Sequence, residues 1–161
     1  MNKKGTIQDV ILIAVVLFVF ALTTLIVFKV SNTLNTEFQA SSVITSNGKT
    51  AFSTINNMYP GVIDNMFLLL TIGLGVVAII LSSLIRQNPV FFVFFILVMA
   101  ILIFITAIFS NVYLTIANNS NFTTEAEALT FTTHTIWLLP FIIGILGFVL
   151  ALIQYKNWRD T

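Results

Sequence analysis

The side chains that could carry out chemistry in this sequence are few: six carboxylates, one histidine and no cysteine. The histidine, His134, lies one turn before a long apolar run, and Glu125 and Glu127 precede it by about two turns. A structural or catalytic metal site needs several convergent ligands, and neither H-x-x-x-H nor a repeated His–carboxylate spacing is present. We therefore expect no metal site and interpret His134 as a hydrogen-bonded residue at a membrane interface.

The other reactive groups favour a protein without enzymatic activity. No G-x-S-x-G or Ser-His-Asp pattern accompanies the serines and threonines, and no glycine-rich phosphate loop occurs. Asp9 and Asp64 are each predicted in the first turn of an apolar helix, where a carboxylate complements the helix dipole. No ionisable side chain falls near the middle of an apolar run, which argues against a pump or coupled transporter. We expect no catalytic residue and no cofactor.

The composition is that of a membrane protein. The chain has 161 residues, of which 58% are hydrophobic and 8% charged, and its mean hydropathy is +1.02. Soluble domains are about 25% charged. A net charge of +1 offers no attractive field to nucleic acid. The aromatic residues expected to anchor the ends of the apolar runs at the membrane interface are Trp137, Trp158, Tyr59, Tyr113 and Tyr155.

Four apolar segments predict an all-α bundle of four transmembrane helices, at about 10–30, 62–85, 89–109 and 136–155. The first is interpreted as a retained signal anchor, because it is longer than a signal-peptide core and no A-x-A site follows it. Pro140 predicts a kink or break near the outer end of the fourth helix.

The second and third segments are separated by a single polar stretch, Arg86-Gln87-Asn88-Pro89. An unbroken helix over 62–109 would be about 72 Å long at the standard rise, and no bilayer is that thick. The chain is therefore predicted to turn here, with Arg86 among the headgroups and Pro89 at the start of the next helix.

The basic residues predict the orientation. One side of the membrane would hold Lys3, Lys4, Arg86, Lys156 and Arg159, while the other holds Lys49 and, at the end of its span, Lys29. Because basic residues favour the cytoplasmic side, both termini are expected there, or in the equivalent interior of a virion. Residues 1–161 then form one integral membrane domain with outer segments 31–61 and 110–135.

The two outer segments are expected to be mostly helical and to pack into a small headpiece. The first helix is predicted to continue beyond the bilayer, TSNGKT (45–50) to form a turn, and the residues around 52–59 to be helical again. IANNSNF (116–122) is interpreted as a loop, and TEAE (124–127) as a Thr-x-x-Glu capping box that opens a helix towards the membrane. Two disordered loops are the alternative.

Small residues repeat at steps of three or four along the second and fourth spans. Such stripes let helices approach closely in lipid, where dispersion replaces the hydrophobic effect. We predict that the two stripes meet, within the chain or between copies. They consist of Thr71, Gly75, Ala78 and Ser82 on the second span and of Gly144, Gly147 and Ala151 on the fourth.

Two stretches, MNKKGTIQDVILIAVVLFVFALTTLIVF (1–28) and NPVFFVFFILVMAILIFITAIFSNVYLTIANNSNF (88–122), give the chain a family resemblance. It resembles the small membrane proteins of tailless viruses and phages that contain an internal lipid membrane. The resemblance covers less than half of the chain and transfers no functional residue. It implies a structural role in the virion membrane, with the headpiece facing capsid proteins.

The sequence therefore predicts a non-enzymatic structural membrane protein in an oligomeric assembly. Its expected partners are membrane lipids and other membrane or capsid proteins that contact the outer segments. Two alternatives stay open: an accessory subunit of a cellular membrane complex, and a holin-like or channel pore former. An intramembrane enzyme is the least favoured reading.

Overall fold

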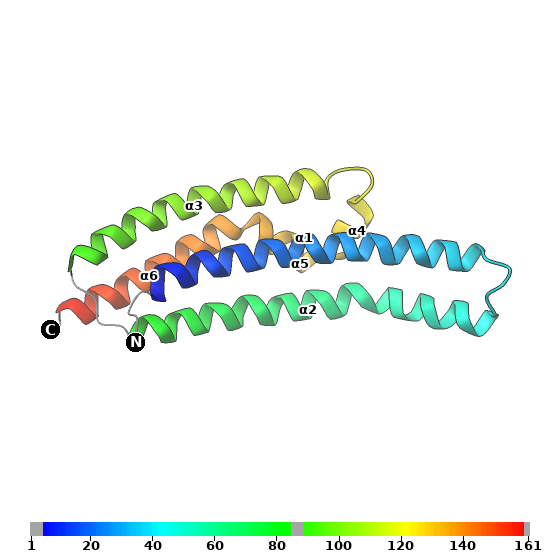
Figure 1. Ribbon diagram of the computed structural model, residues 1–161, viewed down its shortest axis with the longest axis horizontal. Coiled ribbons are helices and arrows are strands. Elements are labelled where there is room, and N and C mark those ends of the chain that lie inside the picture. Colours follow the sequence, from blue (N-terminus) through cyan, green and yellow to red (C-terminus); the bar gives the residue numbers. More distant parts are fainter. Residues whose placement is uncertain (1–4, 85–88, 160–161) are drawn as a thin grey trace.

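The protein is a bundle of four long helices with two short helices packed at one end (Figure 1). The computed structural model describes residues 5–84 and 89–159, and the side chains of 8–83 and 92–156. The long helices are α1 (Gly5–Ala40), α2 (Ser46–Leu84), α3 (Pro89–Ala117) and α6 (Leu139–Arg159), and the short ones are α4 (Thr123–Ala128) and α5 (Thr130–Trp137). The predicted all-α, four-helix architecture is confirmed.

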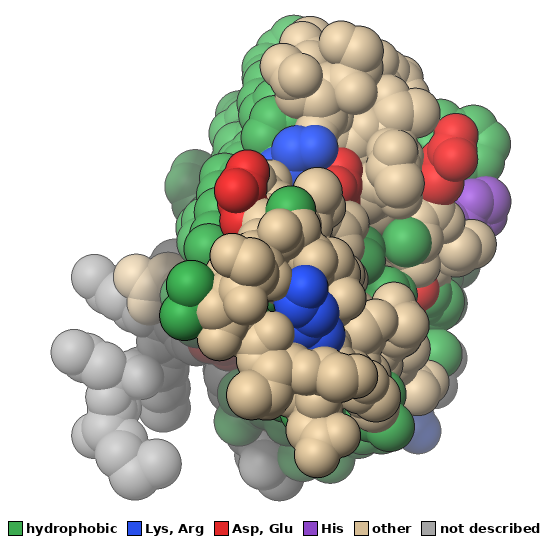
Figure 2. All heavy atoms as spheres, turned by 90° about the vertical axis from the view of Figure 1, so that its right-hand side faces the viewer, with side chains coloured by type: hydrophobic (Ala, Val, Ile, Leu, Met, Phe, Trp, Pro, Cys, Tyr) green, Lys and Arg blue, Asp and Glu red, His purple; other side chains and the backbone are tan. Residues whose placement is uncertain are grey.

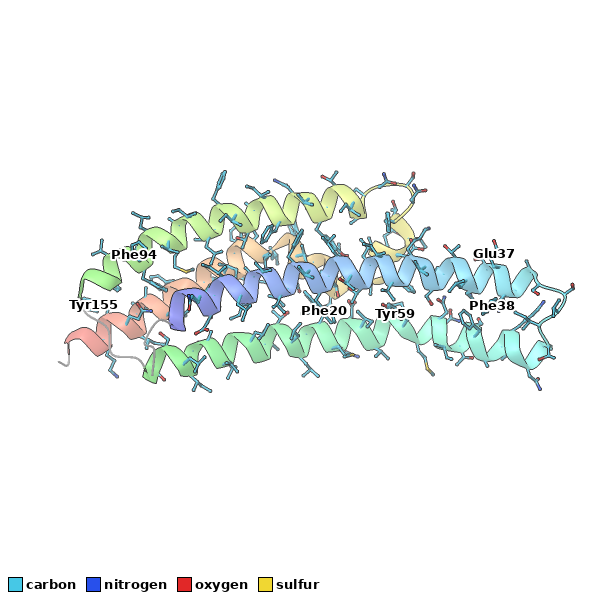
Figure 3. The ribbon with its side chains drawn as sticks, viewed as in Figure 1. Phe20, Glu37, Phe38, Tyr59, Phe94 and Tyr155 are labelled. Carbon is cyan, nitrogen blue, oxygen red and sulfur yellow. The ribbon has the colours of Figure 1, made fainter. Side chains whose placement is uncertain are left out.

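Each long helix contains a segment long and apolar enough to cross a membrane. Large apolar side chains cover the outside of these segments: Leu69 and Phe104 are each 68% exposed, and Phe141 is 71% exposed. Phe94, labelled on α3 in Figure 3, is 55% exposed. A continuous apolar surface of this extent marks a membrane or protein contact, and its position around the middle of the helices fits a hydrocarbon solvent.

Aromatic side chains hold α1 against α2. Phe28 stacks on Tyr59 with ring centroids 5.0 Å apart, and Phe20 stacks on Phe67 at 5.7 Å. Further out, Phe38 meets Phe52 edge-on at 4.6 Å. Figure 3 shows Phe20, Tyr59 and Phe38 following one another along the gap between the two helices. The antiparallel register of α1 and α2 is therefore continuous from the apolar bundle to the tip of the hairpin.

The hairpin between α1 and α2 differs from its prediction in one detail. As expected, α1 continues beyond its apolar run, to Ala40, and residues 52–59 are helical. The predicted turn at 45–50 is wrong, because α2 already begins at Ser46 and contains the Asn-Gly pair. Thr45 accepts a hydrogen bond from the Gly48 N–H at 3.3 Å, so its hydroxyl caps the helix start.

The fourth apolar segment is broken near its outer end, as Pro140 predicts. Leu138 separates α5 from α6, and Pro140 is the second residue of α6, where its missing N–H costs no helical hydrogen bond. Pro89 is likewise the first residue of α3. The turn predicted at residues 86–88 lies outside the described residues.

The two glycines of the α6 stripe face α3 and not the α2 stripe, and a meeting of the two stripes between copies stays a prediction. A Cβ built on Gly144 would lie 3.7 Å from the Ile103 side chain, and one on Gly147 would clash with Met99, so both glycines face α3. Ala78 and Ser82 are buried, whereas a Cβ on Gly75 would meet open space. The glycines of α6 instead allow α3 to approach. The remaining stripe residues, Thr71 and Ala151, are partly buried.

The two glycines of α6 are expected to respond differently to alanine. Gly144→Ala is expected to stabilise the protein by about 0.5 kcal/mol, since alanine favours the helix and the methyl group makes an ordinary contact with Ile103. Gly147→Ala is expected to be less stable than Gly144→Ala by about 1 kcal/mol, because the end of the Met99 side chain must move and this cost offsets the helix preference for alanine. SDS-induced unfolding in mixed micelles measures both. Met99→Ala should remove the penalty at Gly147, and a penalty that persists in that background would contradict the assignment.

Candidate functional site

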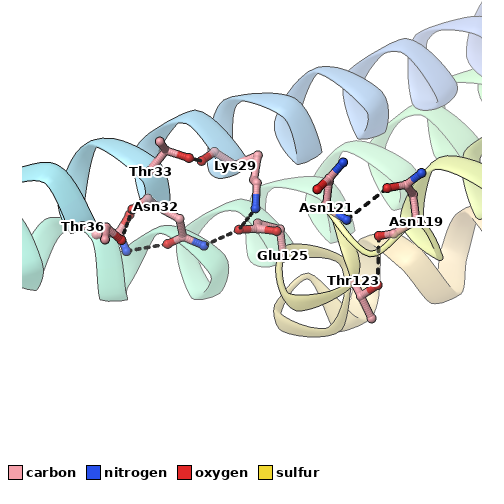
Figure 4. Close-up of polar contacts among 9 residues, drawn as sticks. Lys29, Asn32, Thr33, Thr36, Asn119, Asn121, Thr123 and Glu125 are labelled. Atoms are coloured by element: carbon pink, nitrogen blue, oxygen red, sulfur yellow. Dashed lines mark hydrogen bonds and ion pairs between the residues drawn. The ribbon is translucent and has the colours of Figure 1, made fainter.

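Polar side chains gather where the two short helices pack on the long ones (Figure 4). The Lys29 Nζ of α1 lies 3.4 Å from the Glu125 Oε1 of α4, and the Asn32 Nδ2 donates to the same oxygen at 2.9 Å. The Asn32 Oδ1 accepts from the Asn56 Nδ2 of α2 at 2.7 Å, and the Asn56 Oδ1 accepts from the Ser31 hydroxyl at 2.7 Å. These five residues, the headpiece cluster, join α1, α2 and α4.

Glu125 is the most deeply placed charge of the headpiece cluster. Its side chain is 3% exposed, while that of Lys29 is 38% exposed. A buried carboxylate needs both a counter-charge and hydrogen bonds to offset its lost hydration. Here Oε1 has two donors, whereas Oε2 has no hydrogen-bond partner among the described residues. The contact therefore places α4 firmly against α1, while the second carboxylate oxygen stays buried without a donor from the described residues.

A shallow polar pocket of about 290 Å³ opens beside this carboxylate. Asn32 and Glu125 line it together with threonines of α1 and α4, and Lys29 stands at its side. The pocket offers one cation, one anion and several hydroxyl and amide groups. Such a mixed lining suits hydrogen bonding to a polar surface of another molecule.

Asp64 of α2 positions the second short helix. Its Oδ2 accepts the Phe131 N–H at 2.9 Å, and its Oδ1 accepts the Thr132 N–H at 3.0 Å and the Thr132 hydroxyl at 2.7 Å. The residue at the N-cap of α5 is Leu129, which has no side-chain acceptor. Asp64 thus supplies, from a neighbouring helix, the acceptor and negative charge that a helix start favours.

This finding corrects the prediction for Asp64. The carboxylate was expected at the start of its own span, but α2 begins 18 residues earlier, at Ser46. The dipole that it complements is that of α5. Asp9 lies near the described start of α1, in the second turn.

A third set of contacts ties α5 to α3. The Thr133 hydroxyl donates to the Ala126 carbonyl at 2.9 Å, which leaves its oxygen to accept the Tyr113 hydroxyl at 3.0 Å. Tyr113 is fully buried, so its prediction as an interfacial anchor is wrong. The Ser110 hydroxyl donates to the Trp137 carbonyl at 3.2 Å, at the break between α5 and α6.

The predicted capping box at 124–127 does not form. The N-cap of α4 is Phe122, and no side chain caps it; Glu125 points to α1, and Glu127 is exposed. The loop predicted at 116–122 is confirmed from residue 118 onwards, because α3 ends at Ala117 and residues 118–122 form turns. Here the Asn121 N–H and the Thr123 hydroxyl donate to Asn119 (Figure 4).

His134 is exposed and lies 5.2 Å from the Trp137 ring, measured between centroids. It lines a shallow pocket together with Glu127, while Glu125 faces α1, so the three residues do not converge. In the part of the chain that the structure describes, no three His, Asp or Glu side chains are grouped as metal ligands would be.

The predicted interface residues can be placed only in part. Trp137 and Tyr155 are half exposed and Lys156 is exposed. Lys3, Lys4 and Arg86 lie outside the described residues. The backbone of Trp158 and Arg159 belongs to the last turn of α6. Their role as interfacial and topological residues stays a prediction.

Seen from the hairpin end, acidic and basic side chains lie close together among polar groups (Figure 2). The residues that organise this end were not assigned functions from the sequence, with Asn32 and Asn56 the clearest omissions. Both lie among other amides and hydroxyl residues of the outer segments, such as Asn35 and Asn57, so no local signal distinguishes them. Comparison with protein-family models, curated proteins and solved structures gave no match.

Proposed function

We propose that this chain is a structural membrane protein that spans a bilayer four times and presents an ordered headpiece to other proteins. The headpiece comprises the outer parts of α1 and α2 together with α4 and α5. The observation that carries the proposal is the headpiece cluster: three helices are fixed by buried polar contacts at one end of a bundle whose outer surface is otherwise apolar.

Rigidity is what a contact surface requires, because a preordered surface loses little conformational entropy on binding. The Lys29–Glu125 pair, the Asp64 cap and the Tyr113–Thr133 contact all order short helices that have no apolar span of their own. At the hairpin tip, Val43 is 89% exposed, which leaves an apolar side chain available to a partner.

In the setting that the family resemblance implies, the bilayer is that of a virion and the headpiece contacts the capsid shell. Both termini then lie on the opposite side, in the virion interior or, during synthesis, in the cytoplasm. No catalytic step is proposed for any residue.

A photoreactive amino acid at Val43 tests this function. In the purified assembly, light should join Val43 to one defined protein present in comparable amount, whereas the same group at Phe104 of α3 should react with lipid. A shell protein as the product supports the virion role, and a respiratory or other enzyme subunit would favour the accessory-subunit alternative. The proposal would be overturned if Val43 formed no adduct with any protein and the chain were found as a monomer in host membranes.

A further inference from the structure

One face of α2 carries exposed apolar side chains from the headpiece through the membrane span. Ile55 and Met58 are 65% and 62% exposed, and Leu69 is 68% exposed. The spacing of three or four residues repeats along the whole helix. This α2 outer stripe consists of Ile55, Met58, Val62, Met66, Leu69 and Gly73.

The members of the stripe fall on one side of α2. At about 100° per residue its members fall within a sector roughly 80° wide, and Val76 and Ile80, both about half exposed, continue it. Asp64 and Ser82 fall on the opposite side of the helix, where Asp64 bonds to α5 and Ser82 is buried. Figure 1 shows α2 along one edge of the bundle, so its outer face has no partner within the chain.

Lipid covers only part of this stripe. Val62 onwards belongs to the apolar span, where acyl chains are the solvent. Ile55 and Met58 lie beside Asn56, whose amide bonds to Ser31 and Asn32 of the headpiece cluster. That level contains a lysine, a carboxylate and two amides, and so belongs to the polar region outside the hydrocarbon. An occupant that covers the whole stripe must therefore both cross the membrane and project from it.

A second copy of α2 meets both requirements, because it crosses the membrane and also projects from it. In a parallel pair about a two-fold axis along the membrane normal, each residue meets its own equivalent. Between Lys49 and Arg86 the only charged side chain is Asp64, which faces the bundle, so no like charges oppose each other. Near the middle of the stripe, a Cβ on Gly73 would meet nothing within 4 Å, so another helix can approach closely there.

We propose that the α2 outer stripe is the interface of a two-fold homodimer. The proposal deepens the proposed function and rests on the chain spanning a membrane. It would pair two headpieces side by side and so present them jointly to a partner layer.

Single cysteines test the interface directly, because the sequence contains none. Ile55→Cys and Leu69→Cys sample the polar and the membrane part of the stripe. Phe104→Cys on α3 is the matched control, since Phe104 and Leu69 are both 68% exposed. Under oxidation in membranes rich in lipid, both α2 variants should form disulfide-linked dimers, and Phe104→Cys should remain at background.

Two glycine substitutions, one inside the stripe and one outside it, provide a second measurement. Gly73→Leu, combined with Leu69→Cys, should reduce the cross-linked fraction about tenfold, which corresponds to about 1.4 kcal/mol of association. Gly61→Leu is the control, because Gly61 is also an exposed α2 glycine with open space around it but lies outside the stripe. It should leave the dimer unchanged.

Equal cross-linking at Phe104 and Leu69 would overturn the proposal, as would cross-links from the stripe to a different protein. Alkaline extraction of the same membranes distinguishes a failure of the dimer proposal from a failure of the proposed function. A membrane-resident protein without α2 cross-links overturns the dimer alone, whereas a protein released as soluble chains overturns the proposed function as well.

Discussion

Replacing Asp64 by alanine is expected to lower the free energy of unfolding by about 3 kcal/mol, because three hydrogen bonds to a charged acceptor are lost together. The substitution leaves the Phe131 and Thr132 N–H groups without their acceptor at a partly buried site. It also removes the negative charge from the start of α5. Since Leu129 cannot replace the cap, α5 should detach from α2.

SDS-induced unfolding in mixed micelles would measure this loss. Asp64→Asn keeps the size and one acceptor oxygen and should lose about half as much. Glu37→Ala is the control for removing an acid, because Glu37 is exposed on α1 and its loss should change stability by less than about 0.5 kcal/mol. If Asp64→Ala behaves like Glu37→Ala, the cap does not hold α5.

The second large effect is expected at Asn32. Asn32→Ala removes the donor at 2.9 Å from Glu125 and the acceptor at 2.7 Å from Asn56. Glu125 would then retain only Lys29 at 3.4 Å, and the Asn56 amide, in a residue 6% exposed, would lose its acceptor. The expected cost is about 2 kcal/mol, because buried polar groups are left unpaired.

The same unfolding measurement applies, with Asn35→Ala as the matched control. Asn35 lies one turn further along α1, and its amide oxygen accepts only an exposed contact from Gln39 at 3.3 Å. Its loss should cost less than about 0.5 kcal/mol. A double variant in which Asn56→Ala adds its full separate cost to that of Asn32→Ala would show that the two amides are not coupled.

The helices could be predicted from the sequence because hydrophobic length and the positions of proline are local properties. Pro89 and Pro140 mark a helix start and a break at the predicted places. The extension of α1 past its span was likewise predictable from its continued spacing. The turn at 45–50 was misplaced, since the Thr45 hydroxyl caps a helix that includes the Asn-Gly pair.

The contacts of the candidate site were not predictable in the same way, because their partners are remote in sequence. Asp64 bonds to Thr132, and Lys29 to Glu125, only after four helices have packed. Local rules assigned Asp64 to the start of its own span and considered Glu125 only beside His134, and in both cases the partner is a residue of another helix. The α6 glycines were recognised as packing residues, but spacing alone could not identify α3 as the helix that they face.

The central claim is that the headpiece and the C-terminal end of α6 lie on opposite sides of a membrane. Thiol labelling in sealed vesicles tests this claim most directly. Val43→Cys, Asn121→Cys and Lys156→Cys can be made one at a time in the cysteine-free chain, and all three positions are exposed. A maleimide that cannot cross the bilayer should label Val43→Cys and Asn121→Cys from one face and Lys156→Cys only from the other. Labelling of Val43→Cys and Lys156→Cys from the same face would contradict the account.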